Sequence, residues 1–193
     1  MFPTRFHLKT RFTAVMLVAA MTASAWAAAA DSGFKLQSAE MTAGGSLGDQ
    51  QVYNSFGCSG KNVSPALSWS GAPAGTKSYA ITLYDPDAPT GSGWWHWVVY
   101  NIPAGVTALA SGAGDAGGKL PAGAVQGHTD FGSSGYGGPC PPAGDKAHRY
   151  IFTVYALKTD KIDVPADSSA AMVGYMLHAN ALAKSTLLTR YGR

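Results

Sequence analysis

Cysteine is scarce in this chain, which has 193 residues and only two cysteines, Cys58 and Cys140. The chain can therefore carry one intrachain bridge at most. In an oxidising compartment the favoured interpretation is a disulfide between these two residues. It would close a loop of about 80 residues and stabilise the fold by about 4 kcal/mol in the chain-entropy model. The other interpretation is two separate thiols, one of them reactive.

The chain also has little excess of basic residues outside its N-terminus. It contains 14 Lys and Arg against 11 Asp and Glu, and three of the basic residues, Arg5, Lys9 and Arg11, lie in residues 1–30, which hold no acidic residue. Residues 31–193 are therefore close to neutral. This balance does not indicate a broad basic face, so we expect no binding of nucleic acid or an anionic membrane.

A long hydrophobic run is missing as well. The apolar segment 14–25 is too short to cross roughly 30 Å of hydrocarbon, but it follows a basic start and precedes small residues. We interpret residues 1–30 as a signal peptide cleaved after Ala25, Ala27 or Ala30, and an uncleaved anchor is the alternative. The prediction is a periplasmic or secreted protein with no transmembrane segment after cleavage.

Residues 31–193 are predicted to form a single, mostly β domain, because this length suits one core and is too short for two ordinary domains. Short β-like runs are separated by many of the 24 glycines and 11 prolines. We interpret Ala104–Gly127 as a long surface excursion. We expect a packing helix over Ala170–Thr189, because apolar residues recur there at helical spacing: Met172, Met176, Ala179, Ala183 and Leu187.

The stretch Tyr79–Pro103 carries the most informative residues. Its DPDAP turn joins two apolar strands, and Pro86 and Pro89 end the strand pairing and hold Asp85 and Asp87 in a stiff loop. In the returning strand, period-two alternation predicts one face with Trp94, His96 and Val98 and an opposite face with Trp95, Trp97 and Val99. A histidine therefore emerges close to two aspartates.

A second informative stretch, Asp130–Leu157, joins a glycine-rich loop to a buried strand. The glycines of Gly135–Gly138 permit positive φ, so their amides can converge as an anion-binding nest that the neighbouring prolines stiffen. His148 and Tyr150 then open the strand on a shared face. The hydroxyl of Tyr150 and the imidazole groups are suitable hydrogen-bond partners for a phosphate or carboxylate.

Each of these residues also has a purely structural interpretation. His96 can be a satisfied core histidine, Asp87 can bond the turn backbone, and Tyr150 can pack with its hydroxyl tied to the backbone. The glycine cluster can be a tight turn.

Five segments together resemble the phosphatidylethanolamine-binding protein family, and especially its bacterial Raf-kinase-inhibitor-like branch: CSGKNVSPALSW, DPDAP, WWHWVVYNIP, YGGPCPPAGDKAHRY and HANALAKSTLLTRYGR. The resemblance implies a large antiparallel sheet packed on a smaller one, with a few helices that include a C-terminal one, and an anion pocket at one end of the large sheet. The implied ligand-binding residues are Asp85, Asp87, His96, Gly138, Pro139, His148 and Tyr150. Asp85 would orient a histidine or accept from an ammonium group such as that of ethanolamine.

The expected function is non-catalytic binding of a small anion, namely phosphate, a phospholipid headgroup or a carboxylate, without a cofactor or metal. The alternative is inhibition of an extracytoplasmic protein partner, and a homodimer is left open. A cysteine hydrolase would need a Cys140 thiolate beside a histidine, and a zinc site from Asp85, His96 and His148 lacks short ligand spacing. The glycines also lack the Lys-Ser/Thr that follows a nucleotide-binding loop.

Overall fold

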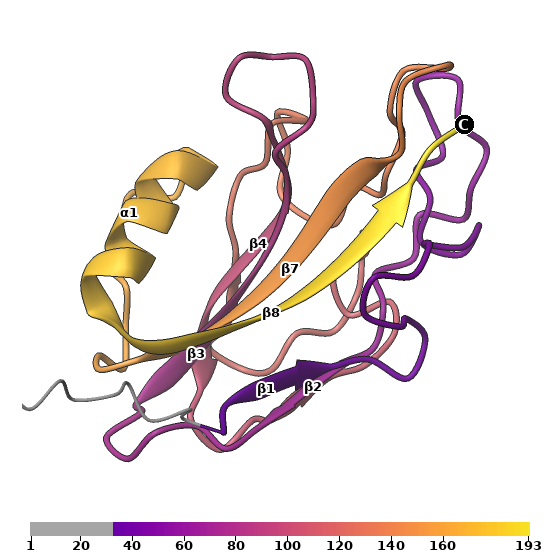
Figure 1. Ribbon diagram of the computed structural model, residues 1–193. Coiled ribbons are helices and arrows are strands. Elements are labelled where there is room, and N and C mark those ends of the chain that lie inside the picture. The colour runs from indigo at the N-terminus through magenta and orange to yellow at the C-terminus, as the bar shows by residue number, and fades with distance from the viewer. Residues whose placement is uncertain (1–32) are drawn as a thin grey trace, which may run out of the picture. The chain divides into compact units, whose positions relative to one another are not determined.

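Two antiparallel sheets form the framework of the computed structural model, which describes residues 33–193 (Figure 1). The predicted signal peptide lies outside these residues. The larger sheet has the strand order β6-β4-β3-β7-β8 and the smaller sheet the order β1-β2-β5. The strands are β1 (Lys35–Gln37), β2 (Leu67–Ser70), β3 (Ser78–Asp85), β4 (Trp94–Pro103), β5 (Ala108–Leu109), β6 (Val125–Gln126), β7 (His148–Leu157) and β8 (Ala181–Tyr191).

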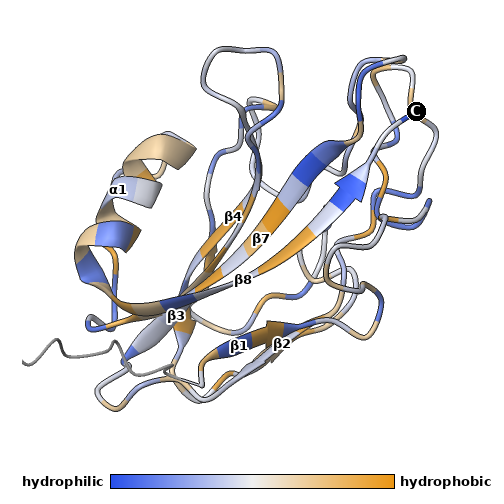
Figure 2. Ribbon diagram, viewed as in Figure 1, coloured by the Kyte–Doolittle hydropathy of each residue, from blue (hydrophilic) through white to orange (hydrophobic). Residues whose placement is uncertain are grey.

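The large sheet is covered on both faces, which explains its nearly continuous apolar central strands (Figure 2). Ile81, Val99 and Val154 pack in the core between the two sheets. On the other face, Ala80 and Val98 pack against the single helix of the described chain, α1 (Ala170–Asn180). These two layers confirm the predicted fold, with one helix in place of the few expected. Over residues 33–193, no helix is long and apolar enough to span a bilayer.

The C-terminal segment corrects the predicted helix. α1 begins after the N-cap Ser169 and ends at Asn180, and the chain continues directly into strand β8. The buried face of α1 is also different from the predicted one: Met172 is half exposed, whereas Val173 and Leu177 are buried. Residues four positions apart, such as Ala183 and Leu187, share a face in a strand as well as in a helix, so that spacing does not distinguish the two structures.

The segment Ala104–Gly127 lies mostly at the surface, as predicted, but it also contributes to both sheets and to the core. It supplies β5 to the smaller sheet and β6 to the larger one, and Leu109 and Ala113 lie in the core between the sheets. The carboxylate of Asp115 accepts a hydrogen bond from the Ser64 amide at 2.7 Å. The segment therefore closes the side of the two-sheet core.

Candidate functional site

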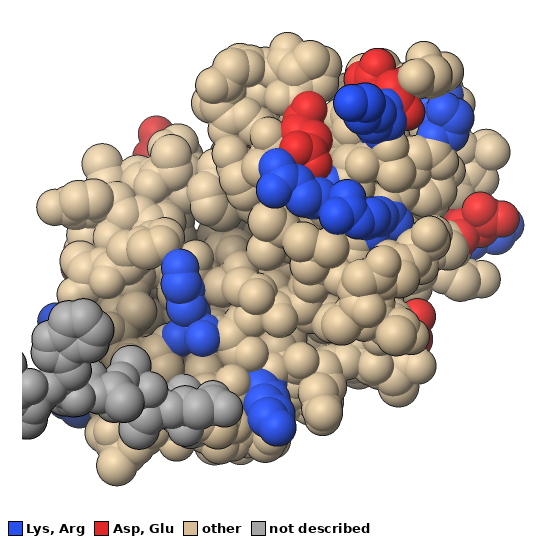
Figure 3. Space-filling view, in the orientation of Figure 1, with Lys and Arg blue, Asp and Glu red and all other residues tan. Residues whose placement is uncertain are grey.

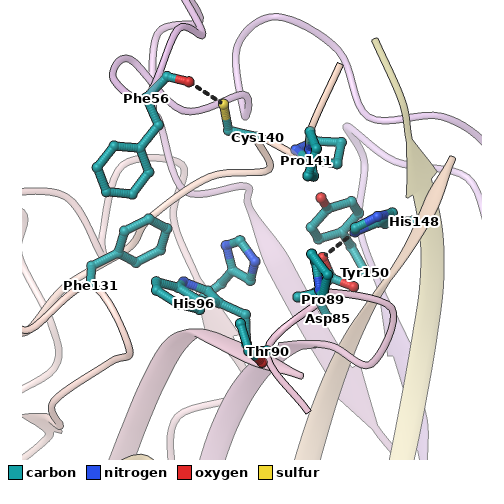
Figure 4. A pocket seen from close by; sticks show the side chains of 13 residues that line it. Phe56, Asp85, Pro89, Thr90, His96, Phe131, Cys140, Pro141, His148 and Tyr150 are labelled. Carbon is teal, nitrogen blue, oxygen red and sulfur yellow. Dashed lines mark hydrogen bonds and ion pairs between the residues drawn. The ribbon is translucent and has the colours of Figure 1, made fainter. Parts of the chain in front are cut away.

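A small cavity lies at the end of the large sheet where β3 ends and β4 and β7 begin (Figure 4). These strands are antiparallel neighbours, so residues far apart in the sequence meet at one edge. The cavity has a volume of about 190 Å³. It is lined by Phe56, Asp85, Ala88, Pro89, Thr90, Trp94, His96, Phe131, Cys140, Pro141, Pro142, His148 and Tyr150.

A β-bulge directs His96 into this cavity. Leu83 on β3 pairs with Trp97, and the next residue, Tyr84, pairs with Trp95, so that His96 has no pairing partner on β3. The extra residue breaks the predicted alternation of faces: Trp95 packs on the side of α1, whereas Trp97 packs between the sheets. The prediction that these two tryptophans share a face is wrong.

The backbone of the glycine-rich loop holds His96 at two points. The Gly137 amide donates to the His96 carbonyl oxygen at 2.9 Å, and the His96 Nδ1 lies 2.8 Å from the Gly137 carbonyl oxygen. Burial lowers the pKa of His96 to about 4, although the hydrogen bond with Gly137 and the charge of Asp85 act to raise it. The imidazole is therefore neutral at physiological pH.

Asp85 and His148 form a buried pair on the cavity wall. The Asp85 Oδ2 lies 2.8 Å from the His148 Nδ1, and its Oδ1 accepts from the Asp87 amide at 2.8 Å. The other ring nitrogen of His148, Nε2, lies 3.6 Å from the Asp145 carboxylate. Both oxygens of the Asp85 carboxylate are thus engaged within the protein, and Asp85 fixes the orientation of His148.

The hydroxyl of Tyr150 is buried without a hydrogen bond of normal geometry to any described residue. Burial raises the pKa of Tyr150, and the nearby negative charge of Asp85 raises it further, so the hydroxyl stays protonated. Its ring packs edge-to-face with His96 at 5.3 Å between centroids, and its oxygen points into the cavity (Figure 4). An unpaired buried hydroxyl is costly unless water or a ligand accepts its proton.

Asp87 points away from the cavity and pairs with Arg149. The Arg149 Nη2 donates to Asp87 Oδ1 at 2.6 Å, while its Nε and its backbone amide donate to Oδ2 at 2.9 and 2.8 Å. This pair belongs to an open charged cleft beside the cavity, which Asp145, Lys146 and Arg190 also line. Charged side chains gather over the start of β7 and the end of β8, whereas most of the face in view is uncharged (Figure 3).

The ion pair of Asp87 and Arg149 is expected to stabilise the protein less in acid. Hydrogen bonds from Arg149 lower the pKa of Asp87 to about 2, from an ordinary value of 3.8. Its stabilising contribution is therefore present above pH 3.8 and is lost as the pH falls through 2. We expect Asp87→Asn to lower the free energy of unfolding by up to about 1 kcal/mol at pH 6, because the pair is partly exposed. Urea unfolding from pH 6 to pH 2 should show the difference shrinking below pH 4; a constant difference would contradict this.

The glycine-rich loop does not form the predicted anion-binding nest. The amide of Gly137 donates to His96, and that of Gly138 donates to the Asn62 side chain at 2.7 Å. Pro139 has no amide hydrogen, and its carbonyl oxygen accepts from the Tyr53 amide at 3.0 Å. Neither Gly138 nor Pro139 lines the cavity. They position the loop that holds His96.

Close packing explains why residue 138 is glycine. A Cβ atom added there would lie 2.0 Å from the Gln51 carbonyl oxygen and 2.8 Å from the Val52 carbonyl carbon, which are backbone atoms that cannot swing away. We expect Gly138→Ala to lower the free energy of unfolding by about 1–3 kcal/mol or more, because overpacking typically costs that much. The matched control is Gly105→Ala, where an added Cβ meets nothing within 4 Å. Equal stability of the two variants in urea would refute the packing argument.

The cavity rim contains aromatic residues that were not predicted as site residues from the sequence. Phe131 contacts His96, Trp94 and Phe56 with ring-centroid distances of 5.4, 5.4 and 6.0 Å. Phe56 is 66% exposed at the cavity mouth. Phe131 comes directly before the glycine-rich loop, and this position in the sequence could have identified it as a rim residue. Nothing in the sequence around Phe56 indicates that it lies at the cavity.

A disulfide joins the two loops of the rim, which confirms the predicted bridge. Cys58 and Cys140 are bonded, and Cys140 lines the cavity, where its Sγ lies 3.5 Å from the Phe56 carbonyl oxygen (Figure 4). Arg193 reinforces the same junction by donating to the carbonyl oxygens of Pro141 at 2.8 Å and Gly57 at 3.0 Å. Within residues 33–193, no three potential metal-binding side chains gather as a cluster.

Comparison with known proteins identifies close relatives over the whole domain. YbcL of Escherichia coli K12, a UPF0098 protein, is 55% identical over 185 residues, which cover 95% of this chain and 98% of YbcL. YbhB of the same organism is 48% identical over 157 residues, which cover 81% of this chain and 99% of YbhB.

Solved structures agree with these sequence matches. The crystal structure of E. coli YbcL, described as a member of the mammalian PEBP family, superposes with a TM-score of 0.82 at 56% identity and covers 83% of this chain and 99% of its own. A phosphatidylethanolamine-binding protein homologue from Chlamydia trachomatis gives a TM-score of 0.70 at 30% identity, covering 84% and 99%. The family model for the phosphatidylethanolamine-binding protein matches residues 37–192. The fold, the sequence motifs and these relatives agree, and the chain belongs to the phosphatidylethanolamine-binding protein family.

Proposed function

We propose that this protein is an exported, non-catalytic binding protein for a small oxyanion, such as phosphate, a phospholipid headgroup or a carboxylate. The observation that carries the proposal is the Tyr150 hydroxyl, a buried donor on the cavity wall that lies near Asp85 and makes no hydrogen bond of normal geometry to the described residues. A ligand oxygen would satisfy it. The neighbouring His96 is held rigidly by Gly137, so the site is preorganised and loses little conformational entropy on binding.

The size and lining of the cavity support a small ligand. A volume of about 190 Å³ is below the roughly 300–1,000 Å³ of sites for drug-sized molecules. Phe56, Phe131 and Trp94 add an apolar rim that suits the carbon atoms next to a headgroup. Because Cys140 is bonded to Cys58, it offers no thiolate for the hydrolase alternative.

Export is supported by two independent features. The N-terminal basic and apolar pattern is typical of a signal peptide, and a disulfide is most stable in an oxidising compartment. Both features agree with a periplasmic or secreted location.

The test is native mass spectrometry of the protein purified from its own cell envelope without refolding, followed by titration of phosphoethanolamine and inorganic phosphate. We expect a co-purified anion, or saturable binding of one of these probes, that is lost in His96→Ala. If neither probe binds and His96→Ala matches the wild type, the proposed function is wrong.

A further inference from the structure

His96 presents a hydrogen-bond acceptor to the cavity. Its Nδ1 lies 2.8 Å from the Gly137 carbonyl oxygen, and a carbonyl oxygen can only accept, so Nδ1 carries the proton. The remaining ring nitrogen, Nε2, forms no hydrogen bond of normal geometry within the described part of the chain, and His96 lines the cavity. In this tautomer Nε2 is a lone-pair acceptor.

The surroundings of the ring hold this orientation. The Gly137 amide donates to the His96 carbonyl oxygen at 2.9 Å, so backbone and side chain are fixed to the same residue. The rings of Phe131 and Tyr150 pack against the imidazole at 5.4 and 5.3 Å. Turning the ring over would place a carbon against the Gly137 carbonyl oxygen and lose a buried hydrogen bond.

The titratable groups near His96 do not charge it above about pH 5. Burial lowers the pKa of His96 to about 4. It outweighs the backbone hydrogen bonds of the glycine-rich loop and the charges of Asp85 on β3 and Asp130 between β6 and β7, which act to raise the pKa. From β7, Tyr150 contacts the ring, and His148 lines the same cavity. His96 Nε2 is therefore a hydrogen-bond acceptor at pH 5 and above, where binding would be measured.

The charges on the cavity wall disfavour a dianion. None of the described residues that line the cavity is a lysine or an arginine, and the wall includes the buried carboxylate of Asp85. Two polar atoms of the wall lie next to each other: the Tyr150 hydroxyl, a donor without a hydrogen bond of normal geometry to the described residues, and His96 Nε2, an acceptor in the tautomer that Gly137 sets. A ligand that satisfies both atoms has one unprotonated oxygen and one hydroxyl on the same group.

We infer that the cavity selects oxyanions that retain one proton, the class represented by a phosphate monoester monoanion. His96 Nε2 accepts the proton of the ligand, and the Tyr150 hydroxyl donates to an unprotonated oxygen. This inference rests on the proposed function and names His96 as the residue that sets its specificity. A fully ionised anion would place an oxygen lone pair against Nε2, and sites with such a mismatch reject a ligand strongly.

Calorimetric titration with three probes tests the inference on the wild-type protein. Methyl phosphate can be a monoanion with one proton, dimethyl phosphate is a monoanion without one, and sulfate is a dianion without one. At pH 5 we expect methyl phosphate to bind at least about tenfold more tightly than the other two probes. Because the second pKa of a phosphate monoester is near 6, its affinity should fall about 100-fold between pH 5 and pH 8.

The variant His96→Gln separates specificity from structure, because a glutamine amide can turn its NH₂ group toward the ligand. We expect its sulfate affinity to approach its methyl phosphate affinity, with little pH dependence, whereas a purely structural role would weaken all probes equally. If wild-type protein binds sulfate as tightly as methyl phosphate, or if methyl phosphate affinity does not change with pH, the protonation inference is wrong and the proposed function stands. If no probe binds, both are wrong.

Discussion

Replacing Tyr150 with phenylalanine is expected to weaken the binding of methyl phosphate by about 10- to 100-fold while leaving the free energy of unfolding unchanged. A hydrogen bond to a charged group contributes about 1.5–3 kcal/mol, and each 1.4 kcal/mol is a factor of ten in affinity. The hydroxyl forms no hydrogen bond of normal geometry with residues 33–193, and both oxygens of the nearby Asp85 carboxylate have other partners, so its removal leaves no protein group unsatisfied. Calorimetry at pH 5 and urea unfolding measure the two quantities.

Tyr136→Phe is the matched control for this variant. Tyr136 is also buried, but its hydroxyl donates to the Gln51 carbonyl oxygen at 2.9 Å, and it does not line the cavity. Its removal leaves a buried acceptor unpaired, so we expect a loss of about 1–3 kcal/mol in stability with unchanged affinity. If Tyr150→Phe lost stability and kept its affinity, its hydroxyl would be a structural group and the proposed site would be wrong.

Removing the disulfide is expected to have the second large effect. The bond closes a sequence separation of 82 residues, which corresponds to about 4 kcal/mol in the chain-entropy model. We expect Cys58→Ala/Cys140→Ala to lower the Tm by roughly 10 °C, given about 2–4 °C per kcal/mol for a domain of this size. Anion affinity should fall as well, because Cys140 forms part of the cavity wall.

Reductant provides the control for the disulfide. Differential scanning calorimetry of the wild-type protein with and without dithiothreitol should reproduce the shift in Tm, whereas the double variant should not respond. A double variant as stable as the oxidised wild type would show that the remaining contacts of the rim, including those of Arg193, hold the two loops without the bond.

The sequence motifs identified four residues that the structure brings to one cavity: Asp85, His96, His148 and Tyr150. They lie at the ends of antiparallel neighbours, so strand order alone brings them together once the DPDAP turn and the HRY strand start are located. Asp87 lies next to this group in sequence but faces Arg149, because Asp85 already bonds its amide and turns the loop. Its predicted ligand role stays a prediction.

The features that the sequence did not predict depend on partners far away in the chain. The bulge at His96 depends on how β4 pairs with β3. The pattern of residues in β4 alone therefore does not reveal it. The amide of Gly138 is paired with Asn62, which is 76 residues away, so glycine content alone could not show whether a nest forms. The rim residue Phe56 reaches the cavity through the disulfide-linked loop.

The proposed anion site is tested most directly by a crystal structure of the wild-type protein with methyl phosphate bound at pH 5. We expect a phosphate in the cavity, with one oxygen about 2.7 Å from the Tyr150 hydroxyl and another about 2.8 Å from His96 Nε2. A phosphate bound instead in the charged cleft beside Arg149 and Arg190, with the cavity holding only water, would contradict it.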